Sequence, residues 1–159
     1  EAVEGYRTEA KMNPPLRAAE DVAAVRAGLA DGTLDTIATD HAPHHYDEKE
    51  AAFAEAPNGI VGLETALAIV LTKVVDEGVI DLSTMIERMS CAPARAFGLP
   101  GGTLGEGSPA DVTVFDAEAR WTVDPQAFRS KSRNTPFTGW ELRGRPRLTL
   151  VGGRVVFES

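Results

Sequence analysis

The sequence has a single cysteine, Cys91, and only three histidines, all of which lie between positions 41 and 45. A lone cysteine cannot form an intrachain disulfide, which fits a reducing cytoplasm, and we expect a small apolar residue rather than a catalytic thiol. No apolar run approaches the roughly 18 residues needed to cross a bilayer. The chain begins at Glu1 without methionine or a signal peptide, so we expect a cytoplasmic protein with a cut or processed start.

Basic residues are also scarce, because 16 Lys and Arg stand against 24 Asp and Glu, giving a net charge of −8. This balance argues against nucleic acid and against anionic membrane surfaces as partners, since both require a basic face. A small anionic substrate stays compatible with it, because local cations can outweigh the overall field. The length of 159 residues and the hydrophobic fraction of 43% indicate a globular protein with one ordinary core.

The pattern of elements changes near Gly98, with helices and strands alternating before it and strands dominating after it. Thr84 and Glu87 have the spacing of a capping box, and Gly152-Gly153 suits a two-residue hairpin. The expected helices cover residues 21–30, 63–77 and one from 82 onward; the expected strands cover 34–39, 111–115, 147–151 and 154–157; a long polar loop covers 41–59.

This order predicts an α/β fold, in which residues 1–98 form the C-terminal part of a β/α barrel. Residues 99–159 would then form part of a small β-sandwich. A complete barrel of this type has eight strands and about 250 residues, and there is room here for two strands at most. We therefore expect the chain to be the rear portion of an enzyme.

Asp40 follows the expected strand 34–39 and would lie on the active face of such a barrel. A carboxylate there is well placed to bind a metal ion or to transfer a proton. The alternative is a role as helix N-cap or turn former in the segment Asp-His-Ala-Pro, and spacing alone leaves both readings open.

Three histidines within five residues suggest a metal site, because histidine is the most common metal ligand. Pro43 makes the backbone extended or turned, however, so the three rings cannot all point to one centre. We expect His44 to project over the pocket mouth towards an anionic substrate, His41 to be structural and His45 to face solvent. A polar turn without function is the alternative.

Asn13 precedes two prolines, which hold its backbone extended, and its amide can both donate and accept at the edge of a cyclic imide or ureide. An Asx-type turn is the alternative. Lys11 and Arg17 could be site cations, although surface salt bridges are the more common role. Backbone amides in residues 58–64 could face a ligand, and we expect Glu64 to stabilise a helix N-terminus through the helix dipole.

Taken together, these segments resemble dihydroorotases, which are members of the amidohydrolase superfamily. The segments that carry the resemblance occur in the family order and spread over nearly the whole chain. They are residues 11–17 (Lys-Met-Asn-Pro-Pro-Leu-Arg), 31–33 (Asp-Gly-Thr), 37–44 (Ile-Ala-Thr-Asp-His-Ala-Pro-His), 59–65 (Gly-Ile-Val-Gly-Leu-Glu-Thr) and 133–137 (Arg-Asn-Thr-Pro-Phe).

The resemblance implies a distorted β/α barrel with an accessory β-sandwich. It implies the reversible, zinc-dependent interconversion of dihydroorotate and N-carbamoyl-aspartate in pyrimidine synthesis, with one or two zinc ions activating the attacking water. By the same likeness Asp40 is a metal ligand and the general acid/base. Asn13 and His44 bind the substrate, His44 at its carboxylate, and backbone groups of Pro57, Asn58 and Gly59 contact the ring.

The family's His-x-His-x-Arg motif, its bridging carboxylate or carbamylated lysine and two further histidine ligands are absent here. We therefore expect most zinc ligands to lie upstream, in a missing N-terminal part of the same enzyme, and the chain alone to be inactive. Unpaired strand edges favour association, which suggests a homo-oligomer. Two alternatives are a non-catalytic scaffold that binds aspartate transcarbamoylase and a related ring hydrolase such as a hydantoinase.

Overall fold

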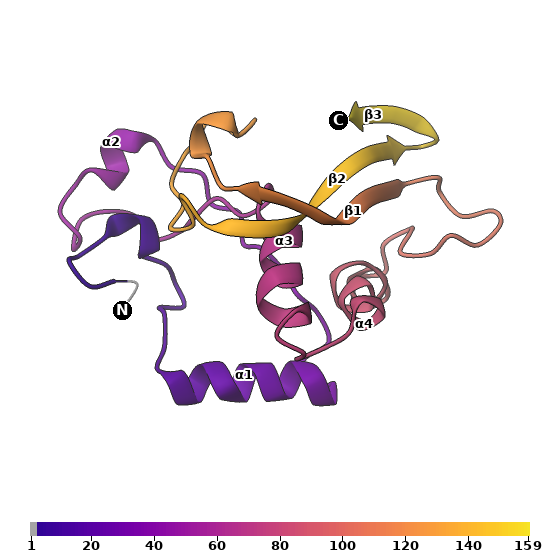
Figure 1. Cartoon of the computed structure of the whole chain (residues 1–159), viewed down its shortest axis with the longest axis horizontal. Helices are drawn as coiled ribbons and strands as arrows, with labels where there is room; N and C mark the ends of the chain where they lie inside the picture. Colours follow the sequence, from indigo (N-terminus) through magenta and orange to yellow (C-terminus); the bar gives the residue numbers. More distant parts are fainter. Residues whose placement is uncertain (1–2) are drawn as a thin grey trace. The chain divides into compact units, whose positions relative to one another are not determined.

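A computed structural model describes residues 3–159 (Figure 1). Short helices fill the first two thirds of these residues, and three strands form one sheet in the order β1-β2-β3. No helix in this range is long and apolar enough to cross a membrane. The elements are η1 (Thr8–Ala10), α1 (Ala19–Asp31), α2 (Tyr46–Lys49), α3 (Ala66–Val70), η2 (Leu71–Val75), α4 (Leu82–Ile86), η3 (Glu87–Cys91), α5 (Ala92–Phe97), β1 (Val112–Thr122), η4 (Pro125–Ala127), β2 (Glu141–Val151) and β3 (Arg154–Glu158).

The chain forms two compact units, and each draws on segments far apart in the sequence. The first unit contains the described residues up to Val22 together with Thr39–Ala66 and Trp121–Glu141. The second contains Ala23–Ala38, Leu67–Arg120 and Leu142–Ser159. The first unit holds all the residues proposed above for the site, and the second holds the main hydrophobic core.

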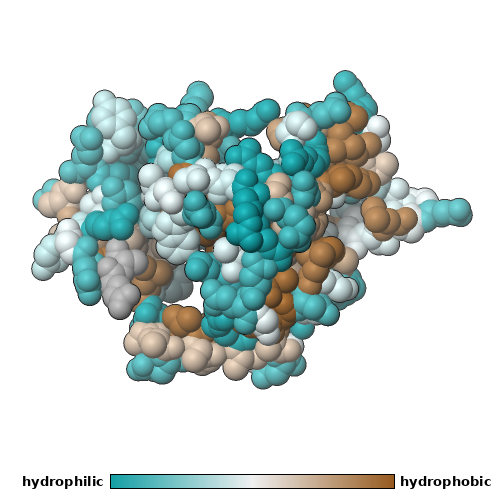
Figure 2. All heavy atoms as spheres, viewed as in Figure 1, coloured by the Kyte–Doolittle hydropathy of each residue, from teal (hydrophilic) through white to brown (hydrophobic). Residues whose placement is uncertain are grey.

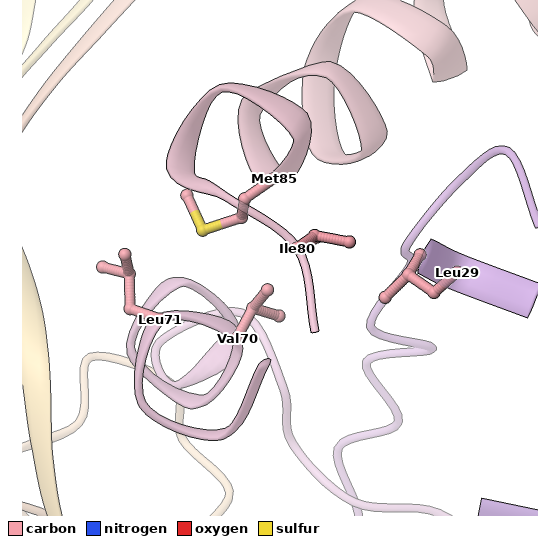
Figure 3. Packing of buried hydrophobic residues seen from close by; sticks show 5 residues of the cluster. All are labelled: Leu29, Val70, Leu71, Ile80 and Met85. Carbon is pink, nitrogen blue, oxygen red and sulfur yellow. The ribbon is translucent and has the colours of Figure 1, made fainter. Parts of the chain in front are cut away.

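The core of the second unit is built from the helical segments (Figure 3). Leu71 is fully buried and Met85 is 1% exposed, so each contributes on the order of 2 kcal/mol through burial of its side chain. Leu29, from the end of α1, joins the same cluster. The buried members are Leu29, Val70, Leu71, Ile80 and Met85.

The helical run 66–75 packs beneath strand β2 in the second unit (Figure 1). The Thr72 hydroxyl accepts a hydrogen bond from the Arg143 backbone N–H at 3.0 Å. Gly144 has a φ of 99°, and a Cβ added there would lie 2.2 Å from Cδ1 of Leu71. Glycine at this position therefore avoids both a strained backbone and an overlap with the Leu71 side chain.

The β2–β3 hairpin turns at Gly152 and Gly153 as the sequence predicts, and β2 pairs with β3 in antiparallel fashion, with an irregularity between Thr149 and Leu150. Both β1 and β2 are longer than the expected strands. Figure 2 shows hydrophobic side chains gathered over this hairpin, at the upper right of the view. Val155 and Val156 are 56% and 59% exposed.

The helix boundaries differ from the sequence prediction at two places. The expected helix 63–77 begins only at Ala66, because residues 63–65 form a turn, and it continues as the π-helical turn η2. The capping box expected from Thr84 and Glu87 is wrong: the Asp81 carboxylate caps α4 by accepting the Thr84 N–H at 2.7 Å. α5 has Pro93 in its first turn and ends at Gly98, which has a φ of 62°.

The strand expected at residues 34–39 does not form within the described residues. The segment is extended, and the Ile37 N–H donates to the Arg88 carbonyl at 2.9 Å. One isolated parallel bridge joins His41 to Ile60 just beyond it. A strand requires a ladder of backbone partners along its length, and the backbone contacts of this segment within residues 3–159 do not form one.

Candidate functional site

Asp40 is held in a strained backbone conformation, with a φ of 45°. The left-handed region is uncommon for residues with a side chain, and such strain is concentrated at functional sites. Its carboxylate is exposed and makes no hydrogen bond or ion pair within residues 3–159, so it caps no helix and closes no turn there. It is therefore free to bind a cation or to carry a proton.

His41 anchors its own segment rather than pointing to a common centre with the other histidines. Its ring Nδ1 accepts the Gly62 N–H at 3.0 Å, which places the ring proton on Nε2 in the neutral form. The Ala42 N–H donates to the Ile60 carbonyl at 2.9 Å. Segment 41–42 is thereby fixed alongside segment 60–62, directly after Asp40.

His44 is engaged at both ring nitrogens. Its Nε2–H donates to the Asn58 carbonyl at 2.9 Å, and its Nδ1 lies 3.4 Å from a carboxylate oxygen of Glu48. His45 instead caps α2, because its ring accepts the Asp47 N–H and its own N–H donates to Glu48. For His44 to contact a ligand carboxylate, its ring would have to release one of these two partners.

The carbonyl groups of segment 57–59 are bound by a lysine side chain. The Lys49 ammonium donates to the carbonyls of Pro57 at 2.9 Å and Gly59 at 3.1 Å. Lys49 is buried, and this burial lowers its pKa from the usual value; the nearby charge of Lys11 lowers it further, while Glu9 opposes the shift. The segment is therefore fixed by a cation that has been removed from water.

Lys11 makes the same kind of contact and, among residues 3–159, does not form the surface salt bridge that the sequence suggested for it. Its ammonium donates to the carbonyls of Phe53 at 2.6 Å, Ala54 at 3.2 Å and Ala56 at 2.6 Å. A second contact comes from its backbone, because its carbonyl accepts the Gly59 N–H at 2.9 Å. The chain around residue 11 is thus tied to the loop 53–59.

Asn134 joins the two loops that carry the candidate residues. Its buried amide group donates to the carbonyls of Ala42 at 2.9 Å and Gly59 at 3.1 Å. Its side-chain oxygen accepts the His44 N–H at 3.3 Å, and its backbone carbonyl accepts the Val61 N–H at 3.0 Å. Asn134 therefore sets the spacing between the segment of His44 and segment 57–61.

The structure thus brings His44 and Asn58 into contact, with Pro57 and Gly59 beside them in the chain. No hydrogen bond of the described residues joins Asn13 to Asp40 or to His44. Asn13 is exposed and precedes a cis peptide bond to Pro14. Arg17 forms an exposed ion pair with Asp21 at 3.3 Å, which matches the surface role weighed for it.

Sequence reasoning missed Lys49 and noted Asn134 only as part of a family-like segment. Neither has a local signal, because each acts on residues brought close by folding. The role expected for Glu64 is wrong, since α3 begins two residues later at Ala66. The Glu64 carboxylate instead accepts the N–H groups of Arg129 and Ser130, both at 2.9 Å.

A zinc ion at this site would use Asp40, the one candidate ligand whose carboxylate is free. Within residues 3–159, no three side chains of His, Cys, Asp or Glu converge closely enough to hold a metal ion. Zinc in proteins normally takes three or four such ligands. The residues therefore fit the contribution of one ligand to a shared site, and not a complete coordination sphere.

Comparison with known proteins identifies the class to which this arrangement belongs. The sequence model of the amidohydrolase family matches residues 8–156. That match covers nearly all of the chain, so the chain belongs to the amidohydrolase family. Among solved structures, the fold is similar to L-hydantoinase (dihydropyrimidinase) from Arthrobacter aurescens, with a TM-score of 0.91 and 37% identity, over 99% of this chain and 36% of the other.

The curated relatives with similar sequences are dihydroorotases. The chain is 56% identical to the dihydroorotase of Geobacter metallireducens over 158 residues, which are 99% of this chain and 37% of that protein. It is 58% identical to the dihydroorotase of Syntrophotalea carbinolica over 157 residues, again 99% of this chain and 37% of the relative. The chain thus spans little more than a third of the relatives it matches.

Proposed function

We propose that this chain is part of a dihydroorotase, a cyclic amidohydrolase that opens the ring of dihydroorotate to N-carbamoyl-aspartate and closes it again. The similarity to dihydroorotases along almost the whole chain supports dihydroorotate as the substrate. The observation that carries the chemistry is Asp40, whose backbone is strained and whose carboxylate has no partner among the described residues. A scaffold that only binds a partner would not need such a group.

In this proposal Asp40 binds zinc and moves the proton. Zinc, when bound with further ligands, would supply an activated water at neutral pH. The Asp40 carboxylate would accept a proton from the water whose oxygen adds to the ring carbonyl carbon, and it would return that proton to the ring nitrogen as the C–N bond breaks. The exposed carboxylate has no hydrogen-bonding partner among residues 3–159, which leaves both of its oxygens available for this role.

Asn13, His44 and segment 57–59 bind the substrate. Of the backbone N–H groups at positions 58 and 59, that of Gly59 is used by Lys11, whereas that of Asn58 makes no hydrogen bond within the described residues. The Asn58 N–H is therefore the donor available to a ring oxygen or a carboxylate, and Asn13 offers an exposed amide. To bind the substrate carboxylate, the His44 ring would give up its contact with Asn58 or with Glu48.

The wider assignments follow from the same family membership. We infer that residues 1–98 belong to a β/α barrel and residues 99–159 to a β-sandwich, in a cytoplasmic enzyme of pyrimidine synthesis. The exposed apolar hairpin supports self-association, and binding to aspartate transcarbamoylase would be a further interaction. Both associations can be tested by measuring the mass of the protein at its natural length, alone and with that partner.

The decisive experiment replaces Asp40 by asparagine in the protein at its natural length. Loss of proton transfer should lower kcat for dihydroorotate by at least about 10²- to 10⁴-fold with the fold intact. Asp35→Asn is the matched control, because the Asp35 side chain is 77% exposed. Zinc content of both variants separates the ligand role from the proton role, and full activity of Asp40→Asn contradicts the proposal.

The same assay distinguishes dihydroorotase activity from hydantoinase activity. Hydantoin and dihydrouracil, offered beside dihydroorotate, test the hydantoinase reading, for which the similarity to L-hydantoinase is the specific observation. Faster turnover of the uncharged rings than of dihydroorotate would favour the hydantoinase reading over ours.

A further inference from the structure

Lys49 is a buried cation that forms no ion pair within the described residues. It is 7% exposed, and its ammonium is satisfied by two backbone carbonyls rather than by a carboxylate. Burial of a charge is unfavourable unless it is well compensated. A neutral side chain at this position would avoid the free-energy cost of desolvating an ammonium group. We therefore expect the charge to have a function.

Six of the seven carbonyls in loop 53–59, all except that of Glu55, accept a hydrogen bond from a lysine ammonium or a histidine ring. Those of Phe53, Ala54 and Ala56 accept from Lys11, those of Pro57 and Gly59 from Lys49, and that of Asn58 from His44. The positive charges of Lys11 and Lys49 therefore lie on the carbonyl side of loop 53–59. The peptide groups transmit this polarisation towards their N–H sides.

Within segment 57–59, the Pro57–Asn58 peptide differs from the next one because its carbonyl is bound to a cation, the Lys49 ammonium, while its N–H has no partner among the described residues. In the next peptide, both ends are occupied, by His44 and by the Lys11 carbonyl. A cation bound at an amide oxygen withdraws electron density and strengthens the opposite N–H as a donor.

From this arrangement we propose that Lys49 is a positioning residue which makes the Asn58 N–H a selective donor for negatively charged ligands. The ammonium acts through a single peptide group, and it touches no ligand itself. It orients the Pro57–Asn58 peptide and raises the affinity for an anionic ring above that for a neutral ring of the same shape. This inference rests on the proposed function, because it assumes that segment 57–59 faces the substrate.

The test compares two ring ligands with the protein at its natural length. Lys49→Met removes the charge at similar side-chain length. The dissociation constant and KM for dihydroorotate should rise on the order of tenfold, in line with loss of a charge-assisted interaction, while kcat and the affinity for neutral dihydrouracil change less than about threefold. A merely structural role would weaken the binding of both rings to the same degree.

Two control variants locate the effect. Lys11→Met removes the other charge that contacts loop 53–59. The Ala56 carbonyl to which Lys11 donates belongs to a peptide whose nitrogen is that of Pro57 and has no N–H. Lys131→Met removes an exposed charge. Both should keep the preference for the anionic ring, and an equal loss of preference in Lys11→Met would overturn the route through the Pro57–Asn58 peptide.

Two further measurements keep the test decisive if Lys49→Met does not fold. Lys49→Gln retains a neutral donor to the carbonyls, and it should show the same selective loss for the anion. In the unsubstituted protein, the Asn58 amide proton should move downfield in NMR spectra with dihydroorotate and less with dihydrouracil. Equal shifts with both ligands overturn the inference, whereas absence of zinc-dependent turnover by the unsubstituted protein would refute the proposed function instead.

Discussion

Replacement of Asn134 by aspartate should destabilise the first unit although the two side chains have nearly the same shape. The amide nitrogen that donates to the carbonyls of Ala42 and Gly59 becomes a third oxygen facing them. Only the contact of the side chain with the His44 N–H, an acceptor contact, can survive. The substitution therefore removes two hydrogen bonds and introduces a charge at a position that is 5% exposed.

The expected loss of stability follows from these contacts. Each net hydrogen bond contributes about 1 kcal/mol, and a buried carbonyl left without a donor adds about 1–3 kcal/mol. The Gly59 carbonyl keeps its bond from Lys49, so this additional penalty applies mainly to Ala42. We expect the free energy of unfolding to fall by about 3–5 kcal/mol at neutral pH.

Equilibrium unfolding in urea, followed by tryptophan fluorescence and circular dichroism, measures this change in the protein at its natural length. Asn58→Asp is the matched control, because it makes the same chemical change on an exposed side chain and should alter stability by less than about 0.5 kcal/mol. Since the same contacts hold His44, KM for dihydroorotate should rise in Asn134→Asp as well. A stability equal to that of Asn58→Asp would refute the view that Asn134 joins the two loops.

Two further predictions concern the second unit. Gly144→Ala should lower the free energy of unfolding by about 2–4 kcal/mol, because its Cβ would overlap Leu71 and its φ is 99°. Gly153→Ala is the control for backbone strain alone, since Gly153 has a φ of 76° and no close neighbour. Equal losses of stability in thermal unfolding of the two variants would contradict the overlap. The hydrogen bonds from Arg143 hold the pKa of Asp76 below its usual range, so the stability from this pair is present above the unfolded-state pKa and is lost as pH falls through the folded-state pKa. Urea unfolding between neutral and acidic pH should show this loss in the parent protein, and an identical pH dependence in Asp76→Asn would contradict it.

Local patterns in the sequence were sufficient for the elements whose cause is local. The glycine pair at 152–153 turns the hairpin, and Gly98 ends α5, because glycine adopts positive φ with little strain. The family resemblance, which rests on short segments, is confirmed by the match along residues 8–156, whereas the assignment of Asp40 and the histidines to a site stays a prediction. These features depend on residues adjacent in the chain, and so they can be read without coordinates.

Tertiary structure alone decided which groups in that segment are free and which are already bound. The sequence suggested a surface salt bridge for Lys11 and no role for Lys49. In the structure, both ammonium groups bind backbone carbonyls of the same loop. Asn134 contacts residues about 75 to 92 positions away in sequence, and no periodicity or spacing can register contacts at that range. The hydrogen-bond partners of a polar group are settled only when distant segments meet. For this reason, only the folded chain shows that the Asp40 carboxylate has no partner among the described residues.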